Sequence, residues 1–190
     1  MIEHFLNFVI SPGREAYRLS REPAGIKSVI IPAVALLSAS AGISLLEGVS
    51  GEKAVFFLTW ALAARIILVL FFMLVISAGY HFFAEIYGGK GSSGKLYTGL
   101  LYTFSPFCFV APAALILKVF LPSAAVFLMA VFIVFLIFRI FYGQYNIINY
   151  FYGLKGKTAA AVLILPWAIT GFVILIVPAF LIIGLGVMFL

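Results

Sequence analysis

The stretch Tyr87-Gly-Gly-Lys-Gly-Ser-Ser-Gly-Lys-Leu-Tyr-Thr-Gly99 separates two long apolar runs, and it therefore decides where two membrane spans end. It is one of very few polar places in the chain. Gly89, Gly94 and Lys95 fit all but the last position of the phosphate-binding pattern G-x-x-x-x-G-K-[ST]. Leu96 stands where that pattern needs a hydroxyl for magnesium, so we interpret the stretch as a mobile connecting loop and not as a nucleotide site.

The composition makes the lipid bilayer the solvent of this chain. Of its 190 residues, 65% are hydrophobic and only 9% are charged, and the mean hydropathy is +1.25. A helix crosses the hydrocarbon with about 20 apolar residues, so this length holds several spans and no folded soluble domain. The apolar runs are continuous rather than alternating, which favours an all-α, polytopic transmembrane helical bundle over a barrel.

Turn signals divide the chain into an N-terminal flank and a transmembrane domain. The flank covers residues 1–27 and is expected to form a short interfacial helix near the break at Ser11-Pro12-Gly13. The domain covers residues 28–190, and we predict five spans at about 28–46, 54–87, 96–119, 124–150 and 158–190. Prolines inside the third and fifth spans predict kinked helices, because proline removes a backbone donor.

The basic residues are distributed unevenly over the connections. On one side we place the following: Arg14, Arg18, Arg21, Lys27, Lys90, Lys95, Lys155 and Lys157. The opposite connections hold Lys53 and Lys118. The positive-inside rule therefore predicts a cytoplasmic N-terminus and a C-terminus outside. All of the first group except Lys27 are candidate contacts for anionic lipid headgroups or for partner proteins, with topology signalling alone as the alternative.

The first span carries small residues four apart, Ser38 with Gly42 and Ser40 with Ser44. Small residues let a neighbouring helix approach closely, so this face is predicted to be buried against protein and not against lipid. The pattern leaves open whether the neighbour lies in the same chain or in a second copy, and a homo-oligomer is one of the two expectations.

Three charged or titratable positions lie within or near the second span. Arg65 is expected to snorkel to the membrane surface, with an intramembrane functional charge as the alternative. His81 and Glu85 are one helical turn apart and are predicted to pair. A proton relay through this pair is the alternative interpretation.

The end of the fourth span carries a further charge, Arg139, followed by a group of interfacial tyrosines. Gln144, Asn146 and Asn149 come next. We expect these amides to prolong the helix beyond the hydrocarbon and into water.

Pro106 and Pro112 interrupt the third span. Each proline leaves one backbone carbonyl without its helical donor, and Thr103 and Ser105 are placed to bond the freed carbonyl. A packing kink is the preferred interpretation, and a broken helix that lines a substrate path is the alternative. Cys108 is expected to behave as a small buried hydrophobic residue.

The residues that enzymes use are scarce. The chain has six acidic residues, all of them Glu, together with two His and one Cys. It has no H-E-x-x-H pattern, no paired cysteines and no Asp. We therefore expect no enzymatic activity, no cofactor, no metal and no nucleotide. Nucleic acid is not an expected partner either, because a platform of basic and aromatic residues is lacking.

Three segments, in order, resemble the Yip family of five-span membrane proteins. They are Phe8-Val-Ile-Ser-Pro-Gly-Arg-Glu-Ala16, then Gly88-Gly-Lys-Gly-Ser-Ser-Gly-Lys-Leu96 leading to Tyr102-Thr-Phe-Ser-Pro106, and Tyr152-Gly-Leu-Lys-Gly-Lys-Thr-Ala159 before Leu165-Pro166. Eukaryotic members of this family interact with Rab-type GTPases in vesicle traffic. The resemblance implies a non-enzymatic, membrane-resident protein that organises partners or the bilayer through its cytoplasmic loops.

The flank of about 27 residues departs from the eukaryotic members, which have a long cytosolic N-terminal region. The chain resembles the compact, prokaryotic form, and recruitment of a GTPase is not implied. A multi-pass protein of that form would reside in the plasma membrane.

The alternative function is a small transporter, channel or lipid-handling protein. It is motivated by the hydroxyl groups inside the spans and by four prolines, Pro106, Pro112, Pro166 and Pro178. A continuous polar cavity that reaches the middle of the membrane would favour this alternative. A closed, dry bundle would favour the structural role.

Overall fold

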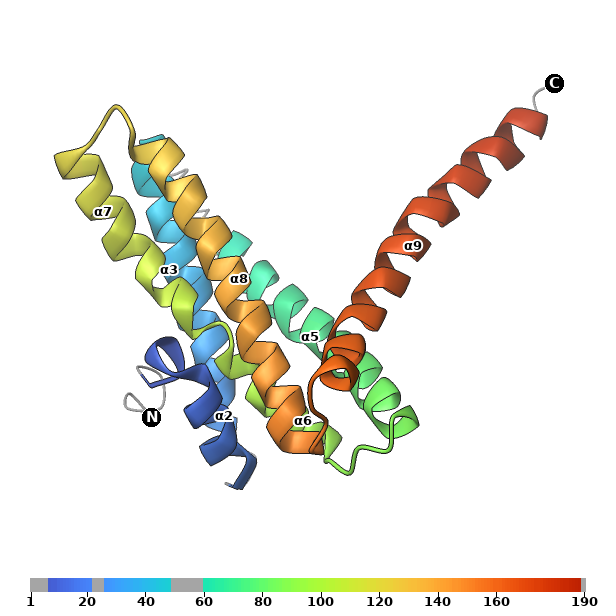
Figure 1. Ribbon diagram of the computed structural model, residues 1–190. Helices are drawn as coiled ribbons and strands as arrows, with labels where there is room; N and C mark the ends of the chain where they lie inside the picture. Colours follow the sequence, from blue (N-terminus) through green and yellow to red (C-terminus); the bar gives the residue numbers. More distant parts are fainter. Residues whose placement is uncertain (1–6, 22–25, 49–59, 189–190) are drawn as a thin grey trace.

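A computed structural model describes residues 7–21, 26–48 and 60–188, with side chains at 7–21, 28–48 and 60–172. The predicted start of the second span at residue 54, together with Lys53 and the side chains of Lys27 and Pro178, lies outside these parts. In the described parts all regular structure is helical, which confirms the all-α prediction. The elements, shown in Figure 1, are α2 (Pro12–Arg21), η1 (Ile26–Val29), α3 (Ile30–Glu47), α5 (Trp60–Ile86), α6 (Ser93–Tyr102), η2 (Ser105–Phe109), α7 (Val110–Phe120), α8 (Ala125–Tyr152) and α9 (Lys157–Met188).

Four stretches of the described residues are long and apolar enough to cross a membrane: Ile30–Glu47, Trp60–Ile86, Ser93–Phe120 and Ala125–Tyr152. The third of these joins α6, η2 and α7. Within its described side chains, α9 adds a shorter apolar helix, Lys157–Phe172. The chain is thus a multi-pass membrane protein, and the fifth span stays a prediction.

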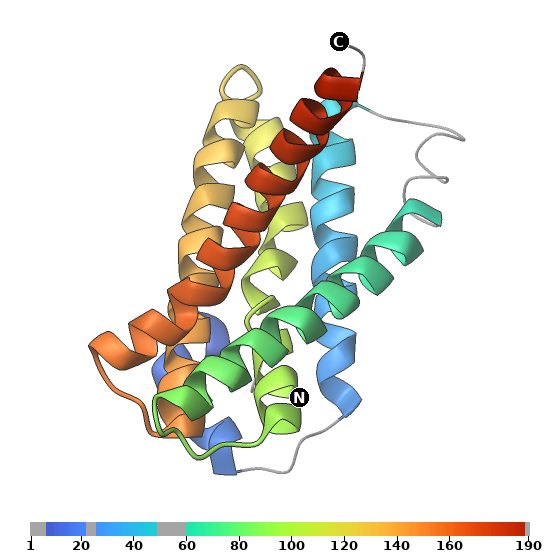
Figure 2. The same ribbon diagram turned by 90° about the vertical axis from the view of Figure 1, so that its right-hand side faces the viewer.

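The helices form one bundle in which α3, α7 and α8 run alongside one another (Figures 1 and 2). Helix α5 crosses this group obliquely (Figure 2). The first part of α9 packs on α5 and α8, where a Cβ added at Gly79 would lie 3.2 Å from Pro166 and the rings of Phe141 and Trp167 are 5.5 Å apart. The remainder of α9 extends away from the other helices in Figure 1.

The outer surface of the bundle is apolar. Phe71 is 67% exposed, Phe138 is 71% exposed and Phe127 is 72% exposed. Rings of this size are rarely left so bare on a soluble protein, because apolar surface is unfavourable in water. Their exposure fits a surface that faces lipid.

Helices α3 and α7 meet along the small residues of α3. A Cβ at Gly42 would lie 2.9–3.1 Å from atoms of Val110, so glycine is required for this close approach. Ser40 and Ser44 are buried on the same helix. The prediction that this face packs against protein is confirmed, and its partner is a helix of the same chain.

The third span is broken between α6 and α7, as the prolines predict. Pro106 lies in η2, and Pro112 lies in the first turn of α7. Because Pro112 has no N–H group, the carbonyl of Cys108 lacks its helical donor. Ser38 of α3 fills the gap, since its Oγ donates to the Cys108 carbonyl at 2.8 Å and accepts from the Ala111 N–H at 3.0 Å.

Two hydroxyls of the third span itself were expected to bond the freed carbonyl. Thr103 Oγ1 donates to the carbonyl of Leu100 at 2.6 Å, one turn before the break. Ser105 is fully buried, and its Oγ has no hydrogen-bond partner in the described part of the chain. The expected role of Ser105 is therefore not observed, because the hydroxyl that serves the break comes from α3.

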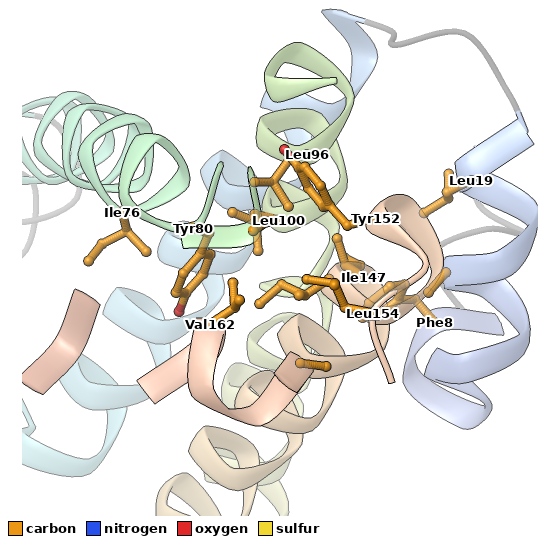
Figure 3. Packing of buried hydrophobic residues seen from close by; sticks show 14 residues of the cluster. Phe8, Leu19, Ile76, Tyr80, Leu96, Leu100, Ile147, Tyr152, Leu154 and Val162 are labelled. Atoms are coloured by element: carbon orange, nitrogen blue, oxygen red, sulfur yellow. The ribbon is translucent and has the colours of Figure 1, made fainter. Parts of the chain in front are cut away.

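The N-terminal flank packs into the bundle and does not form a separate layer. Phe8 is 1% exposed and lies against Gly143 of α8, where a Cβ would come within 2.9 Å of its ring. Ala16 and Leu19 of α2 are buried in the same cluster, which also holds Leu96 and Leu100 of α6 (Figure 3 labels all of these except Ala16). The flank thus completes one of the two hydrophobic clusters described.

Replacing Ser38 with alanine should lower the thermal stability of the purified protein in detergent. The substitution leaves the Cys108 carbonyl and the Ala111 N–H without their shared partner, at a cost of about 1–3 kcal/mol. The measurement is a thermal unfolding curve. The control is Ser123→Ala at an exposed position between α7 and α8, which should leave the midpoint unchanged. Equal midpoints for both variants would contradict the bridging role of Ser38.

Candidate functional site

Several basic segments meet at one end of the bundle, opposite the connection between α7 and α8 (Figure 1). They are α2, the 87–92 loop, the first turn of α6 and the connection from α8 to α9. We call this region the basic end and define it by Arg14, Arg18, Arg21, Lys90, Lys95, Lys155 and Lys157. The structure therefore brings all seven predicted surface residues to the same end of the molecule.

Helix α2 presents its arginines outward because its apolar residues are buried. Glu15, Ala16 and Leu19 are buried, whereas Arg14 and Arg21 are exposed. Arg18 is exposed as well. These arginines recur at helical spacing and so share one face of α2. The guanidinium of Arg21 lies 4.4 Å from the centroid of the Tyr17 ring, a cation–π contact. The ring of Tyr17 in turn meets Tyr150 of α8 edge to face, at 5.6 Å.

The glycine-rich loop is packed against α8, which corrects the expectation of a mobile connection. A Cβ at Gly89 or Gly91 would come within 2.9 and 2.7 Å of the Tyr152 side chain. Gly88 adopts a positive φ of 78°, which reverses the chain after α5. Glycine at these positions therefore serves close packing and a turn.

Two cavities flank the start of α6. One, of about 410 Å³, lies between α2, the loop and α8, and its lining includes Lys90, Ser92 and Lys95. The other, of about 480 Å³, is a mostly apolar groove between α5 and α6. Leu74 and Phe82 line its apolar part, and His81, Glu85 and Ser93 line its polar part.

His81 and Glu85 pair as their spacing predicts. The Nε2 atom of His81 lies 3.4 Å from Oε1 of Glu85. The Nδ1 atom of His81 lies 2.6 Å from the hydroxyl of Tyr152 at the end of α8. The imidazole therefore links α5 to α8 beside the glycine-rich loop.

The arginines within the spans bond to other parts of the chain. Arg65 is half-buried, and its Nη1 donates to Ser40 Oγ of α3 at 3.1 Å, so the side chain is directed at α3. Arg139 donates through Nη2 to the carbonyls of Val9 and Ile10 at 2.7 and 2.8 Å. Arg139 thereby holds the N-terminal flank against α8. Residues 7–10 are helical, and the last carbonyls of a helix have no donor within it, so the guanidinium supplies one.

A buried polar group that the sequence analysis missed joins three helices. The hydroxyl of Tyr80 in α5 donates to Oε1 of Gln144 in α8 at 2.9 Å and accepts from Nε1 of Trp167 in α9 at 2.5 Å. Figure 3 shows Tyr80 in the packed cluster between α5, α6 and α9. The available signal was Gln144 itself, the only glutamine of the chain, within a predominantly apolar helix.

The amides of α8 were expected to emerge into water, and this prediction is wrong for two of them. Gln144 is 1% exposed and Asn146 is 7% exposed. The Nδ2 atom of Asn146 donates to the carbonyl of Tyr142 at 2.7 Å, and its Oδ1 faces Gly13. The amides are buried because α2 and α5 cover this end of α8.

The fold and the site define a polytopic helical membrane protein with basic residues gathered at one end. In the described parts, no cluster of three or more His, Cys, Asp or Glu side chains is placed to hold a metal ion. Residues 6–178 match the family model of the Yip1 domain, so the chain belongs to the Yip1-domain family. No curated protein and no solved structure matches the chain.

Tyr80→Phe should destabilise the protein, because it leaves Gln144 and Trp167 without their common partner in a buried site. We expect a loss of about 1–3 kcal/mol, measured as a lower unfolding temperature in detergent. Tyr142→Phe removes a hydroxyl from an exposed ring of α8 and provides the matched control. If both variants unfold at the wild-type temperature, the Tyr80 contacts do not stabilise the bundle.

Proposed function

We propose that this Yip1-domain protein is a non-enzymatic membrane organiser that binds anionic lipid headgroups and partner proteins through its basic end. The observation that carries the proposal is the convergence of seven basic side chains from four separate segments on one end of the bundle. Topology signalling alone requires basic residues in the cytoplasmic connections, but it does not require these segments to pack together, as α2, the glycine-rich loop and α8 do.

The charge balance of the basic end supports this function. Six of its seven basic side chains are exposed, and Lys95 is half-buried. Of the acidic residues described nearby, Glu15 is buried and Glu85 pairs with His81. Each basic residue near an anionic membrane surface contributes about 1 kcal/mol to the attraction, so even a part of this set gives substantial binding.

We further propose five spans, with the N-terminus in the cytoplasm and the C-terminus outside. The flank, the glycine-rich loop and the α8–α9 connection lie at one end, as this topology requires (Figure 1). The connection between α7 and α8 lies at the other end, where Lys118 of α7 donates through Nζ to the carbonyl of Leu45 at the end of α3. The plasma membrane is the proposed location for a compact member of this type.

The polar contacts inside the bundle support a non-enzymatic role. Ser38 completes the hydrogen bonds of the broken span, and Tyr80 joins three helices. Arg139 binds the carbonyls of the flank. These groups are engaged in holding helices together, which is the usual use of polar side chains between membrane helices.

A second candidate function, lipid handling, is favoured by the apolar groove between α5 and α6. Its apolar wall includes Leu74 and Phe82, which are 54% and 59% exposed on the outer surface of α5. Its polar end lies at Ser93 and Glu85. Purified protein in liposomes that moves no labelled phospholipid between leaflets would remove this candidate.

Removing charge from the basic end should weaken binding to anionic membranes. The protein, reconstituted in nanodiscs of phosphatidylcholine, is mixed with phosphatidylglycerol vesicles at about 0.1 M salt, and co-flotation measures the binding. The variant Arg14→Gln/Lys157→Gln removes two exposed charges without touching either cavity. Two charges at about 1 kcal/mol each predict an affinity about 30-fold lower.

The matched control is Lys53→Gln/Lys118→Gln, which removes the same charge from the connections predicted on the opposite side. It should bind the vesicles within about twofold of the wild type, since exposed charges act over about one Debye length, about 10 Å at 0.1 M salt. An equal loss in both double variants would show that net charge, and not the basic end, attracts the vesicles.

A further inference from the structure

We propose that the cavity between α2, the glycine-rich loop and α8 binds the phosphate group of an anionic membrane phospholipid. Its volume of about 410 Å³ falls within the range of small-molecule sites, about 300–1,000 Å³. Its lining comes from four places in the chain: Ser20 at the end of α2, Lys90 to Ser92 in the loop, Lys95 in α6, and Tyr150 with Phe151 in α8. The inference rests on the proposed function in assigning headgroup contact to the basic end.

The charge of the lining selects an anion. Lys90 and Lys95 both line the cavity, and no carboxylate is among the described residues that line it. Lys95 is half-buried, and its Nζ lies 3.4 Å from the carbonyl of Ser20. An ammonium group has three donors, so this contact fixes the direction of the side chain and leaves donors for a ligand. Lys90 is exposed and reaches the cavity from the loop.

The start of α6 adds the positive end of a helix dipole beside the cavity. The first hydrogen bond of α6 runs from the Leu96 N–H to the Ser92 carbonyl. The N–H groups that precede Leu96 in α6 belong to the first turn, which has no partners within the helix. Ser92 stands at the N-cap without a side-chain capping bond. Ser92 and Lys95, at the start of α6, line the cavity, so the positive end of the helix dipole acts together with the two lysines on an anion there.

The position of the cavity relative to the membrane spans identifies the source of the phosphate. One candidate span begins at Ser93 and another ends at Tyr152, so both ends meet at the cavity. Span ends lie at the level of lipid headgroups. Tyr150 is 42% exposed beside the cavity, and tyrosine favours that interface. A phospholipid can thus place its phosphate in the cavity while its chains stay in the bilayer.

The test measures binding of dioctanoyl phosphatidylglycerol to the purified protein in detergent, by native mass spectrometry and titration. The wild type should retain one tightly bound lipid. Lys90→Gln/Lys95→Gln should weaken the affinity about tenfold or more, since both charges that face the phosphate are lost. Lys53→Gln/Lys118→Gln removes the same charge from the connections predicted on the opposite side, outside the cavity, and should stay within about twofold.

A second variant, Ser92→Trp, keeps the charge and fills the cavity, so it should also abolish the tightly bound lipid. Ser92→Trp therefore tests the cavity even if Lys90→Gln/Lys95→Gln fails to fold. Unchanged affinity in Ser92→Trp, or equal losses in the two lysine variants, would overturn the site.

Titration with inorganic phosphate tests whether the ligand is a lipid or free phosphate. If inorganic phosphate binds and phosphatidylglycerol does not displace it, the ligand is free phosphate and the proposal of a lipid is wrong.

Failure of this site and failure of the proposed function can be told apart. Vesicle binding that depends on Arg14 and Lys157 while the cavity variants bind lipid normally leaves only the proposed function standing. A bound lipid that depends on Lys90, Lys95 and Ser92, without any effect of the outer charges on vesicle binding, leaves only the lipid site.

Discussion

A backbone carbonyl inside the hydrocarbon needs a donor from the protein, because no water is present to supply one. Pro112 creates this need at Cys108, and the hydroxyl of Ser38 meets it from the neighbouring helix while also accepting from Ala111. The close approach at Gly42 makes the contact possible. The contact of Ser38 with Cys108 and Ala111 thus belongs both to the packing of α3 against α7 and to the break in the third span. The direction in which α6 leaves the break depends on this contact.

The same constraint explains how the rest of the interior is used. Tyr80, Gln144 and Trp167 complete one another's hydrogen bonds between α5, α8 and α9. Arg139 completes those of the flank. The polar groups of the interior thereby set the positions of the helices, and most of the exposed basic residues that the structure describes lie at the basic end. The packing of the helices is therefore linked to the proposed binding of headgroups. The basic end forms only when α2, the glycine-rich loop and α8 are packed together.

Local patterns in the sequence predicted most of the helices, since apolar runs, prolines and glycines act on their own segments. The small-residue face of α3, the break at Pro106 and the His81–Glu85 pair follow from spacing alone. The partners of Ser38, Arg139 and Gln144 did not follow, because each lies on a helix distant in the sequence. The burial of Gln144 and Asn146 was missed for a related reason, as it depends on α2 folding back onto α8. The basic end was predicted as a set of residues, whereas its cavity needed the packing.

We propose that the basic end faces the cytoplasm and its anionic leaflet. Single cysteines provide the most direct measurement, introduced as Lys157→Cys and Ser123→Cys in a Cys108→Ser background and labelled with a membrane-impermeant maleimide. In sealed cells, Ser123→Cys should react and Lys157→Cys should not, and the pattern should reverse in inverted vesicles. Labelling of both positions from the same side, or of Lys157→Cys from outside, would contradict a cytoplasmic basic end.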